Sequence, residues 1–133
     1  MAVDIAVDTN TYRDFVEGLA EAVAVIRSSP RICVPFAVVA ELNAGFALGS
    51  RGAENQRVFE RFLHGQRVEV LFPTMETTRQ YANLYRQLRN AGTPIPTNDL
   101  WIAALVVQHD LTLFSRDSHF DCLPQLPRVV SNG

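Results

Sequence analysis

The chain has 133 residues, 47% of them hydrophobic, which predicts one compact domain over residues 1–133 with a sizeable core and no room for a second domain. Its formal net charge of −2 argues against a broadly basic nucleic-acid-binding surface, although metal ions bound among clustered acids would reverse the sign locally. All 12 basic residues are arginine, which excludes Walker-type phosphate-binding loops and Schiff-base enzymes because both need a lysine.

Short β-branched runs alternate with longer segments of helical period, a pattern that predicts an α/β domain with a parallel sheet. Five strands are predicted, at residues 4–7, 32–34, 68–72, 111–114 and 128–130. Between the first two strands, Leu19, Val23 and Ile26 recur at helical spacing, so we expect a helical stretch there, broken near Gly18. Pro30 ends this stretch before the second strand begins.

The rest of the chain contains four segments that predict helices, over residues 36–49, 53–64, 74–90 and 97–108. The third is clearly amphipathic, because Tyr81, Leu84 and Leu88 share one face. The fourth is apolar on all sides, so it must be buried, and Thr97 is its predicted N-cap.

The sequence shows neither the pattern of an export signal nor that of a membrane-spanning segment. The longest apolar run, residues 100–107, is well short of the roughly 20 residues that cross a bilayer. The segment Met1–Asp4 has no basic region or cleavage site, so a cytoplasmic location without membrane contact is expected. Cys33 and Cys122 belong to no Cys-x-x-Cys pair, and we expect two reduced thiols.

Four acids, Asp8, Glu41, Asp99 and Asp117, each lie beside an apolar run although the chain separates them widely. Three of them have ordinary explanations when taken singly. Asp8 and Asp117 are placed to cap helices after their strands, and Asp99 would favour the first turn of its helix through the helix dipole. Glu41 is different, because it lies within a helix beside the apolar face, where an unpaired carboxylate is unfavourable.

Sheet geometry offers a common explanation for the four acids. In an open parallel sheet the ligand crevice lies at the carboxyl ends of the strands, where the strand order reverses. If the first and fourth strands are neighbours, Asp8 and Asp117 face each other there, and the adjoining helices bring Glu41 and Asp99 to the same rim. Carboxylates so close together require a cation, and oxygen ligands favour Mg²⁺ or Mn²⁺ over zinc.

Other acid-rich folds fit less well. Receiver domains and haloacid-dehalogenase-like phosphatases characteristically use a lysine, which this chain lacks. The phosphatases also place a second Asp two residues after the first, where this chain has Asn10.

The acids belong to four short segments, in the order Val7-Asp8-Thr9-Asn10, Val39-Ala40-Glu41-Leu42, Asn98-Asp99-Leu100-Trp101-Ile102-Ala103-Ala104 and Ser115-Arg116-Asp117-Ser118-His119-Phe120. Together these segments resemble the four characteristic motifs of the PIN-domain ribonucleases, and the resemblance covers essentially the whole chain. The compact size is most similar to the VapC toxins of bacterial toxin–antitoxin pairs.

This resemblance implies a three-layer α/β/α sandwich whose parallel sheet has the strand order 3-2-1-4-5. It also implies metal-dependent endonucleolytic cleavage of RNA, with Mg²⁺ or Mn²⁺ as cofactor. By matching position, Asp8, Asp99 and Asp117 would be metal ligands, and Glu41 would bind metal directly or through water.

Several polar residues near the motifs receive supporting assignments. Asn10 and Ser115 occupy positions that the family uses to brace the site. Family members often carry a further acid after the fourth motif; here Ser118 and His119 intervene and Asp121 follows Phe120. Asp121 is therefore assigned a supporting position around the ligands, and a role as a fifth ligand stays open. His119 is expected to be a solvated loop residue, with substrate contact as the alternative.

The resemblance further implies an RNA substrate, a cognate antitoxin protein and a homodimer. Phosphate contacts would come from Arg13, Arg51 or Arg116, each of which is otherwise an ordinary surface arginine. An antitoxin helix would lie in a hydrophobic groove, for which the candidates, otherwise core residues, are Phe46, Leu48, Phe59, Phe62 and Leu63.

Two alternative functions stay open at this stage. A housekeeping RNA-processing nuclease would share the site but have no inhibitory partner, and a small reading frame directly upstream of the gene would distinguish the two. A non-catalytic scaffold would keep the fold and lose the metal.

Overall fold

A computed structural model describes residues 3–129 of the chain. Its centre is a parallel sheet in the order β3-β2-β1-β4, formed by β1 (Ile5–Val7), β2 (Ile32–Pro35), β3 (Val68–Leu71) and β4 (Thr112–Phe114). All residues of β1 and β2 are buried, as expected for strands covered on both faces.

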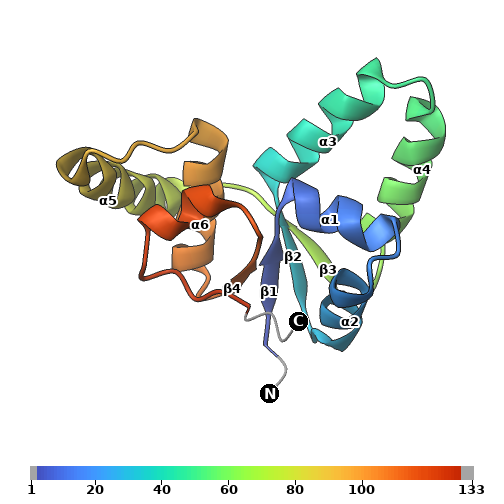
Figure 1. Ribbon diagram of the computed structural model, residues 1–133, viewed down its shortest axis with the longest axis horizontal. Helices are drawn as coiled ribbons and strands as arrows, with labels where there is room; N and C mark the ends of the chain where they lie inside the picture. Colours follow the sequence, from blue (N-terminus) through green and yellow to red (C-terminus); the bar gives the residue numbers. More distant parts are fainter. Residues whose placement is uncertain (1–2, 130–133) are drawn as a thin grey trace.

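Six α-helices and one short 3₁₀ helix surround the sheet within the described residues. They are α1 (Thr9–Val16), α2 (Ala20–Ser28), α3 (Phe36–Leu48), α4 (Gly52–Leu63), α5 (Met75–Ala91), α6 (Thr97–Gln108) and η1 (Ser118–Cys122). Helices α5 and α6 lie on one side of the sheet and α1, α2 and α4 on the other, while α3 runs outward from the sheet edge and α4 returns beside it (Figure 1). This arrangement confirms the predicted α/β/α fold.

The order of the first four strands agrees with the prediction, but the fifth strand does not form as expected. Arg128 makes an isolated parallel bridge with Leu113 of β4, and Val129 has no strand geometry. The last predicted strand residue, Val130, lies outside the described residues. The four-stranded sheet is therefore extended beyond β4 by a single bridge.

The start of α6 also differs from the prediction. Pro96 is the N-cap and Thr97 is the first helical residue, so Thr97 does not cap this helix. Pro96 has φ −56° and ψ 146°, and its ring carries no acceptor, so the N-cap makes no side-chain hydrogen bond. Asp99 consequently lies in the first turn of α6.

Helix α6 is part of the hydrophobic core, and its packing holds Asp99, in its first turn, in a fixed position. Ile102, Ala103, Ala104 and Leu105 are almost completely buried, as the all-round apolar pattern predicted. Along residues 3–129, no helix is long and apolar enough to cross a membrane.

Candidate metal centre

One pocket at the carboxyl ends of the strands gathers all four acids. The cavity, of about 190 Å³, is lined by Asp8, Thr9, Asn10, Arg13, Glu41, Asp99, Ile102 and Asp117. Asp8 directly follows β1, and Asp117 follows β4, which pairs with β1 in parallel. The predicted strand order thus brings together acids from distant parts of the chain.

Asp8 is buried and is held on both carboxylate oxygens. Its Oδ1 accepts hydrogen bonds from the backbone N–H of Thr11 at 3.0 Å and from the Thr11 hydroxyl at 2.9 Å. Its Oδ2 accepts a bond from the hydroxyl of Ser115. Asp8 is therefore the N-cap of α1, the ordinary explanation considered for it, and also a fixed wall of the pocket.

Asp117 is anchored by its neighbours in a similar way. Its backbone N–H donates to Ser115 Oγ at 3.0 Å, and its Oδ1 accepts from the backbone N–H of His119 at 2.9 Å. Since Ser115 contacts both Asp8 and Asp117, its hydroxyl couples the ends of β1 and β4.

Glu41 points from α3 into the pocket and has two polar partners. Its Oε2 accepts from the Thr9 hydroxyl and its Oε1 from the Asn98 amide, each at 3.1 Å. These bonds satisfy the mid-helix carboxylate without neutralising its charge. The sequence did not predict these partners, although Thr9 and Asn98 lie directly beside Asp8 and Asp99.

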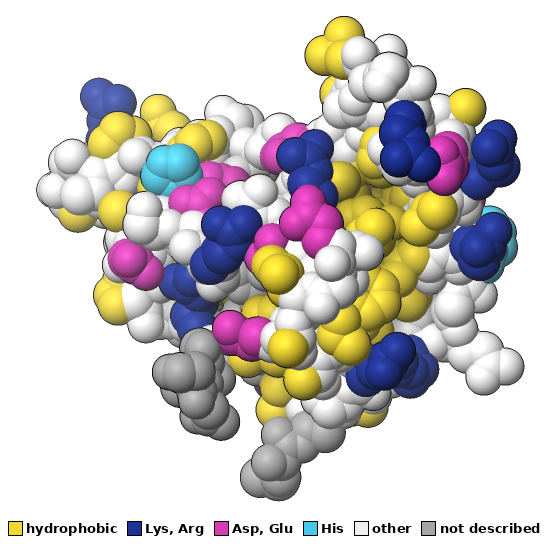
Figure 2. Space-filling model, turned by 45° about the vertical axis from the view of Figure 1, so that its right-hand side comes forward, with side chains coloured by type: hydrophobic (Ala, Val, Ile, Leu, Met, Phe, Trp, Pro, Cys, Tyr) yellow, Lys and Arg dark blue, Asp and Glu magenta, His cyan; other side chains and the backbone are white. Residues whose placement is uncertain are grey.

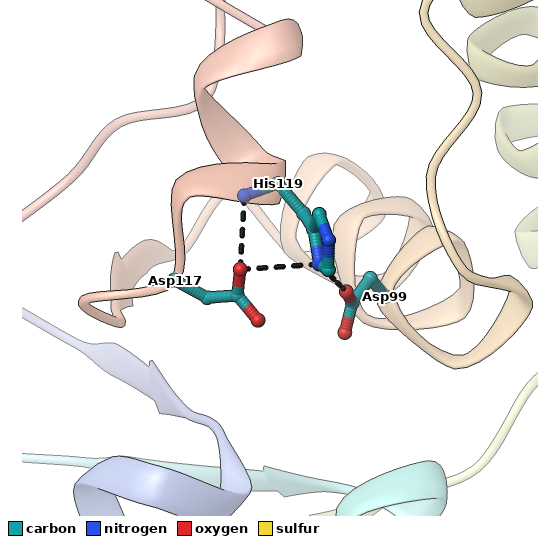
Figure 3. A group of neighbouring side chains, drawn as sticks. All are labelled: Asp99, Asp117 and His119. Atoms are coloured by element: carbon teal, nitrogen blue, oxygen red, sulfur yellow. Dashed lines mark hydrogen bonds and ion pairs between the residues drawn. The ribbon is translucent and has the colours of Figure 1, made fainter.

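His119 lies between Asp99 and Asp117, as Figure 3 shows. Its Nδ1 is 2.9 Å from Asp99 Oδ2 and 3.1 Å from Asp117 Oδ1. The side chain is 49% exposed, so part of it meets solvent, but the expectation of a solvated loop residue missed these contacts. The nearest sequence clue was its position two residues after Asp117.

The electrostatics of the site are unfavourable for a fully charged Asp99. Burial raises the pKa of its carboxyl group, the hydrogen bond from His119 opposes this rise, and the charges of Asp117 and then Glu41 reinforce it. Like charges and poor solvation both disfavour the ionised form, and a bound cation would relieve both.

The remaining predicted residues divide between the pocket and its surroundings. Asn10 lines the pocket. Asp121 does not; it is exposed and pairs with Arg128, which also donates to the Ser115 carbonyl at 2.7 Å. Asp121 therefore reaches the site only through Arg128 and the backbone of Ser115.

The three arginines considered for phosphate binding have different environments. Arg116 forms an ion pair with Asp14 at 3.0 Å, and Arg51 pairs with Glu54 at 2.9 Å. Within residues 3–129, Arg13 makes no ion pair; it lines the acidic pocket and is exposed. Arg13 is thus the arginine that is free to meet a ligand there.

The donor set fits a divalent metal ion. Ligand atoms of Asp99, Asp117 and His119 lie within 4.8 Å of one another, and Asp8 and Glu41 face the same cavity. Hard carboxylate oxygens in this number are the ligands that Mg²⁺ and Mn²⁺ take in proteins. The cluster can therefore hold a metal ion.

The fold and the four acids at the carboxyl ends of its strands are characteristic of one family of proteins. Comparison of the sequence with known families identifies it. Residues 5–125 match the family model described as the PIN domain, and the chain belongs to this family. The resemblance carried by the four motifs is confirmed.

Within the family, the chain is similar to proteins of the VapC type. It is 34% identical over 106 residues to Ribonuclease VapC1 of Haemophilus influenzae strain R2866, covering 74% of this chain and 77% of that relative. It is 28% identical over 97 residues to Ribonuclease VapC4 of Mycobacterium tuberculosis, covering 73% and 75% of the two chains.

Solved structures support the same fold. VapBC-1 from nontypeable Haemophilus influenzae superposes with a TM-score of 0.81 at 25% identity, covering 94% of this chain and 96% of the other. DNA-bound VapBC from Salmonella typhimurium gives a TM-score of 0.83 at 22% identity, over 96% and 97% of the two chains, and shows a likeness of fold.

Proposed function

We propose that the chain is a metal-dependent endoribonuclease and the toxin of a toxin–antitoxin pair. The convergence of four carboxylates in one pocket of a PIN fold carries this proposal. The name ribonuclease, borne by VapC relatives that align with about three quarters of the chain, supports RNA as the substrate.

Asp8, Asp99 and Asp117 are the proposed ligands of Mg²⁺ or Mn²⁺, and Glu41 would bind the ion directly or through water. When bound, such an ion activates water for attack on the phosphodiester and stabilises charge on the leaving oxygen. Ser115 holds Asp8 and Asp117 in position through its hydroxyl, which limits the rearrangement needed on binding. Thr9 and Asn98 orient Glu41 in the same way.

Arg13 is the proposed contact for an RNA phosphate beside the acids. Its guanidinium would supply positive charge at the rim of a pocket that otherwise repels a polyanion. Arg13→Gln should raise the KM for RNA and flatten its salt dependence, with kcat changed less. Arg51→Gln is the matched control, because Arg51 is already paired with Glu54 on the surface.

RNA cleavage with Mg²⁺ or Mn²⁺ by wild type and Asp99→Asn tests the catalytic proposal. Asp99 caps no helix, so its replacement keeps the backbone bonds that Asp8 and Asp117 provide. Asp110→Asn is the control, since Asp110 is exposed beyond the opposite end of α6 and has a positive φ that asparagine tolerates. Cleavage should fall at least about 100-fold in Asp99→Asn alone. Equal cleavage by both variants would refute the assignment.

The antitoxin partner is proposed to occupy a groove between α1, α3 and α4. This groove, of about 420 Å³, is lined by Tyr12, Arg13, Val16, Glu17, Gly45, Phe46, Asn55 and Val58. An apolar surface lies in this part of the molecule, with charged side chains close to it (Figure 2). Because Arg13 lines both the groove and the acidic pocket, a segment bound in the groove would reach the acids.

The groove differs from its predicted lining. Of the five candidates only Phe46 lines it, while Phe59 is buried in the core and Phe62 and Leu63 pack partly buried against the core. Leu48, at the end of α3, is 91% exposed and is not part of it. Core packing therefore explains most of that set.

A pair of valine substitutions tests the groove. Val58→Glu should preserve RNA cleavage but abolish its inhibition by the product of an adjacent antitoxin reading frame, because a charge would enter an apolar contact. Val3→Glu should leave inhibition intact; Val3 is 43% exposed and Val58 37%, so the two are matched. Unchanged inhibition of Val58→Glu would place the partner elsewhere.

Three features stay predictions: that the chain forms one domain, that two copies pair, and that the protein acts in the cytoplasm. The experiments below measure the last two. Light scattering during size-exclusion chromatography measures the number of copies in solution, and fractionation of cells expressing the protein measures its location.

A further inference from the structure

His119 directs its imidazole toward two of the proposed metal ligands. Its Nδ1 faces the two carboxylates of Asp99 and Asp117 at 2.9 and 3.1 Å, and its backbone N–H is already bonded to Asp117 Oδ1. This backbone hydrogen bond holds the main chain of His119 beside Asp117. The imidazole Nδ1 of His119 points into the acid cluster (Figure 3).

The two distances match those between neighbouring ligands of a metal ion. Ligand atoms in adjacent positions of an octahedron with bonds of about 2.1 Å are about 3.0 Å apart. The Nδ1 atom therefore already stands at ligand spacing from one oxygen of Asp99 and one of Asp117. The three ligand atoms all lie within 4.8 Å of one another, so they border the same site.

We infer that His119 is a nitrogen ligand of the metal centre and biases this site toward Mn²⁺ over Mg²⁺. This rests on the proposed metal site, but it adds a residue and a selectivity that an all-oxygen site lacks. Imidazole binds transition-metal ions well, whereas Mg²⁺ takes oxygen ligands and water. Losing His119 should therefore affect the two ions unequally.

Calorimetric titration of RNA-free protein with MnCl₂ and with MgCl₂ measures this selectivity without an activity assay. His119→Ala should bind Mn²⁺ at least about tenfold more weakly, as removal of even an outer partner of a ligand does, while Mg²⁺ affinity changes by less than about threefold. His119→Gln retains hydrogen-bond donors for both aspartates but has no imidazole, so it should not restore Mn²⁺ affinity.

His64→Ala is the matched control. His64 is an exposed histidine that caps α4, with its Nδ1 2.6 Å from the Glu60 carbonyl oxygen, and it is not part of the group formed by Asp99, Asp117 and His119. Its replacement should leave the affinities for both ions unchanged. Circular dichroism of each variant verifies that the fold is retained.

Pulsed electron paramagnetic resonance of bound Mn²⁺ identifies the ligand directly. Nitrogen modulation should be present in wild type and in His64→Ala, and absent in His119→Ala and His119→Gln. Mn²⁺ bound to wild type without nitrogen modulation, or affinity restored by glutamine, would overturn the role of His119. No Mn²⁺ binding at all would instead refute the metal site of the proposed function.

Discussion

Replacing Thr11 with valine removes one buried hydroxyl and keeps the shape of the side chain. Thr11 is 2% exposed, and its Oγ1 accepts a hydrogen bond from the Asp8 N–H at 3.1 Å. The same hydroxyl has a single proton for three acceptors, Asp8 O, Asp8 Oδ1 and Phe114 O, each within 3.1 Å. The variant would therefore leave a buried donor and an acceptor without partners.

The magnitude follows from these bonds. A buried N–H without an acceptor costs about 1–3 kcal/mol, and the lost donated bond adds about 1 kcal/mol. We expect Thr11→Val to lower the free energy of unfolding by about 2–4 kcal/mol and Tm by about 10 °C. Binding of Mn²⁺ should weaken as well, because Asp8 loses the hydroxyl that orients Oδ1.

Urea unfolding followed by circular dichroism measures the loss of stability, with Thr78→Val as the matched control. Thr78 is exposed on α5, and within residues 3–129 its hydroxyl bonds only to the Met75 carbonyl one turn earlier. Its replacement should change the unfolding free energy by less than about 0.5 kcal/mol. If Thr11→Val were equally mild, the network around Asp8 would not be what holds the ends of β1 and β4.

Three further predictions concern the turn after α3, the acid cluster and the core. Gly52→Ala should destabilise the fold by about 1–3 kcal/mol in urea unfolding, because a Cβ would lie 1.9 Å from the Phe46 carbonyl oxygen; Gly49→Ala, whose Cβ would meet only an ordinary contact at 3.5 Å, should be nearly neutral. Asp99→Asn should raise the Tm of metal-free protein at pH 7, since burial raises the pKa of this carboxyl and its charged form opposes folding; the gain should shrink as pH falls toward the unfolded value of 3.8. Cys33 should resist iodoacetamide until the protein unfolds, because burial raises the pKa of its thiol to about 11.

Local sequence patterns predicted the elements and the acids that end beside them. β-Branched runs and helical apolar spacing are local properties, so strands β1 to β4 and helices α3 to α6 were predicted to within a few residues. Helices α1 and α2 were predicted as one helical stretch broken near Gly18. The fifth strand failed because a strand needs a partner along its length, and Arg128 meets β4 at one bridge. The pairing of β1 with β4 was implied by the family resemblance, and with that pairing the crevice rule placed Asp8 near Asp117.

What surrounds those acids was decided only by tertiary packing. Thr9 and Glu41 are 32 residues apart, Glu41 and Asn98 are 57 apart, and Ser115 and Asp8 are 107 apart. No local propensity encodes such contacts, since each depends on how helices sit on the sheet. The sequence by itself therefore determined which carboxylates could share a site. The packing of η1 against α6 decided that His119 lies between two of them, because side-chain direction is set by the backbone that carries it.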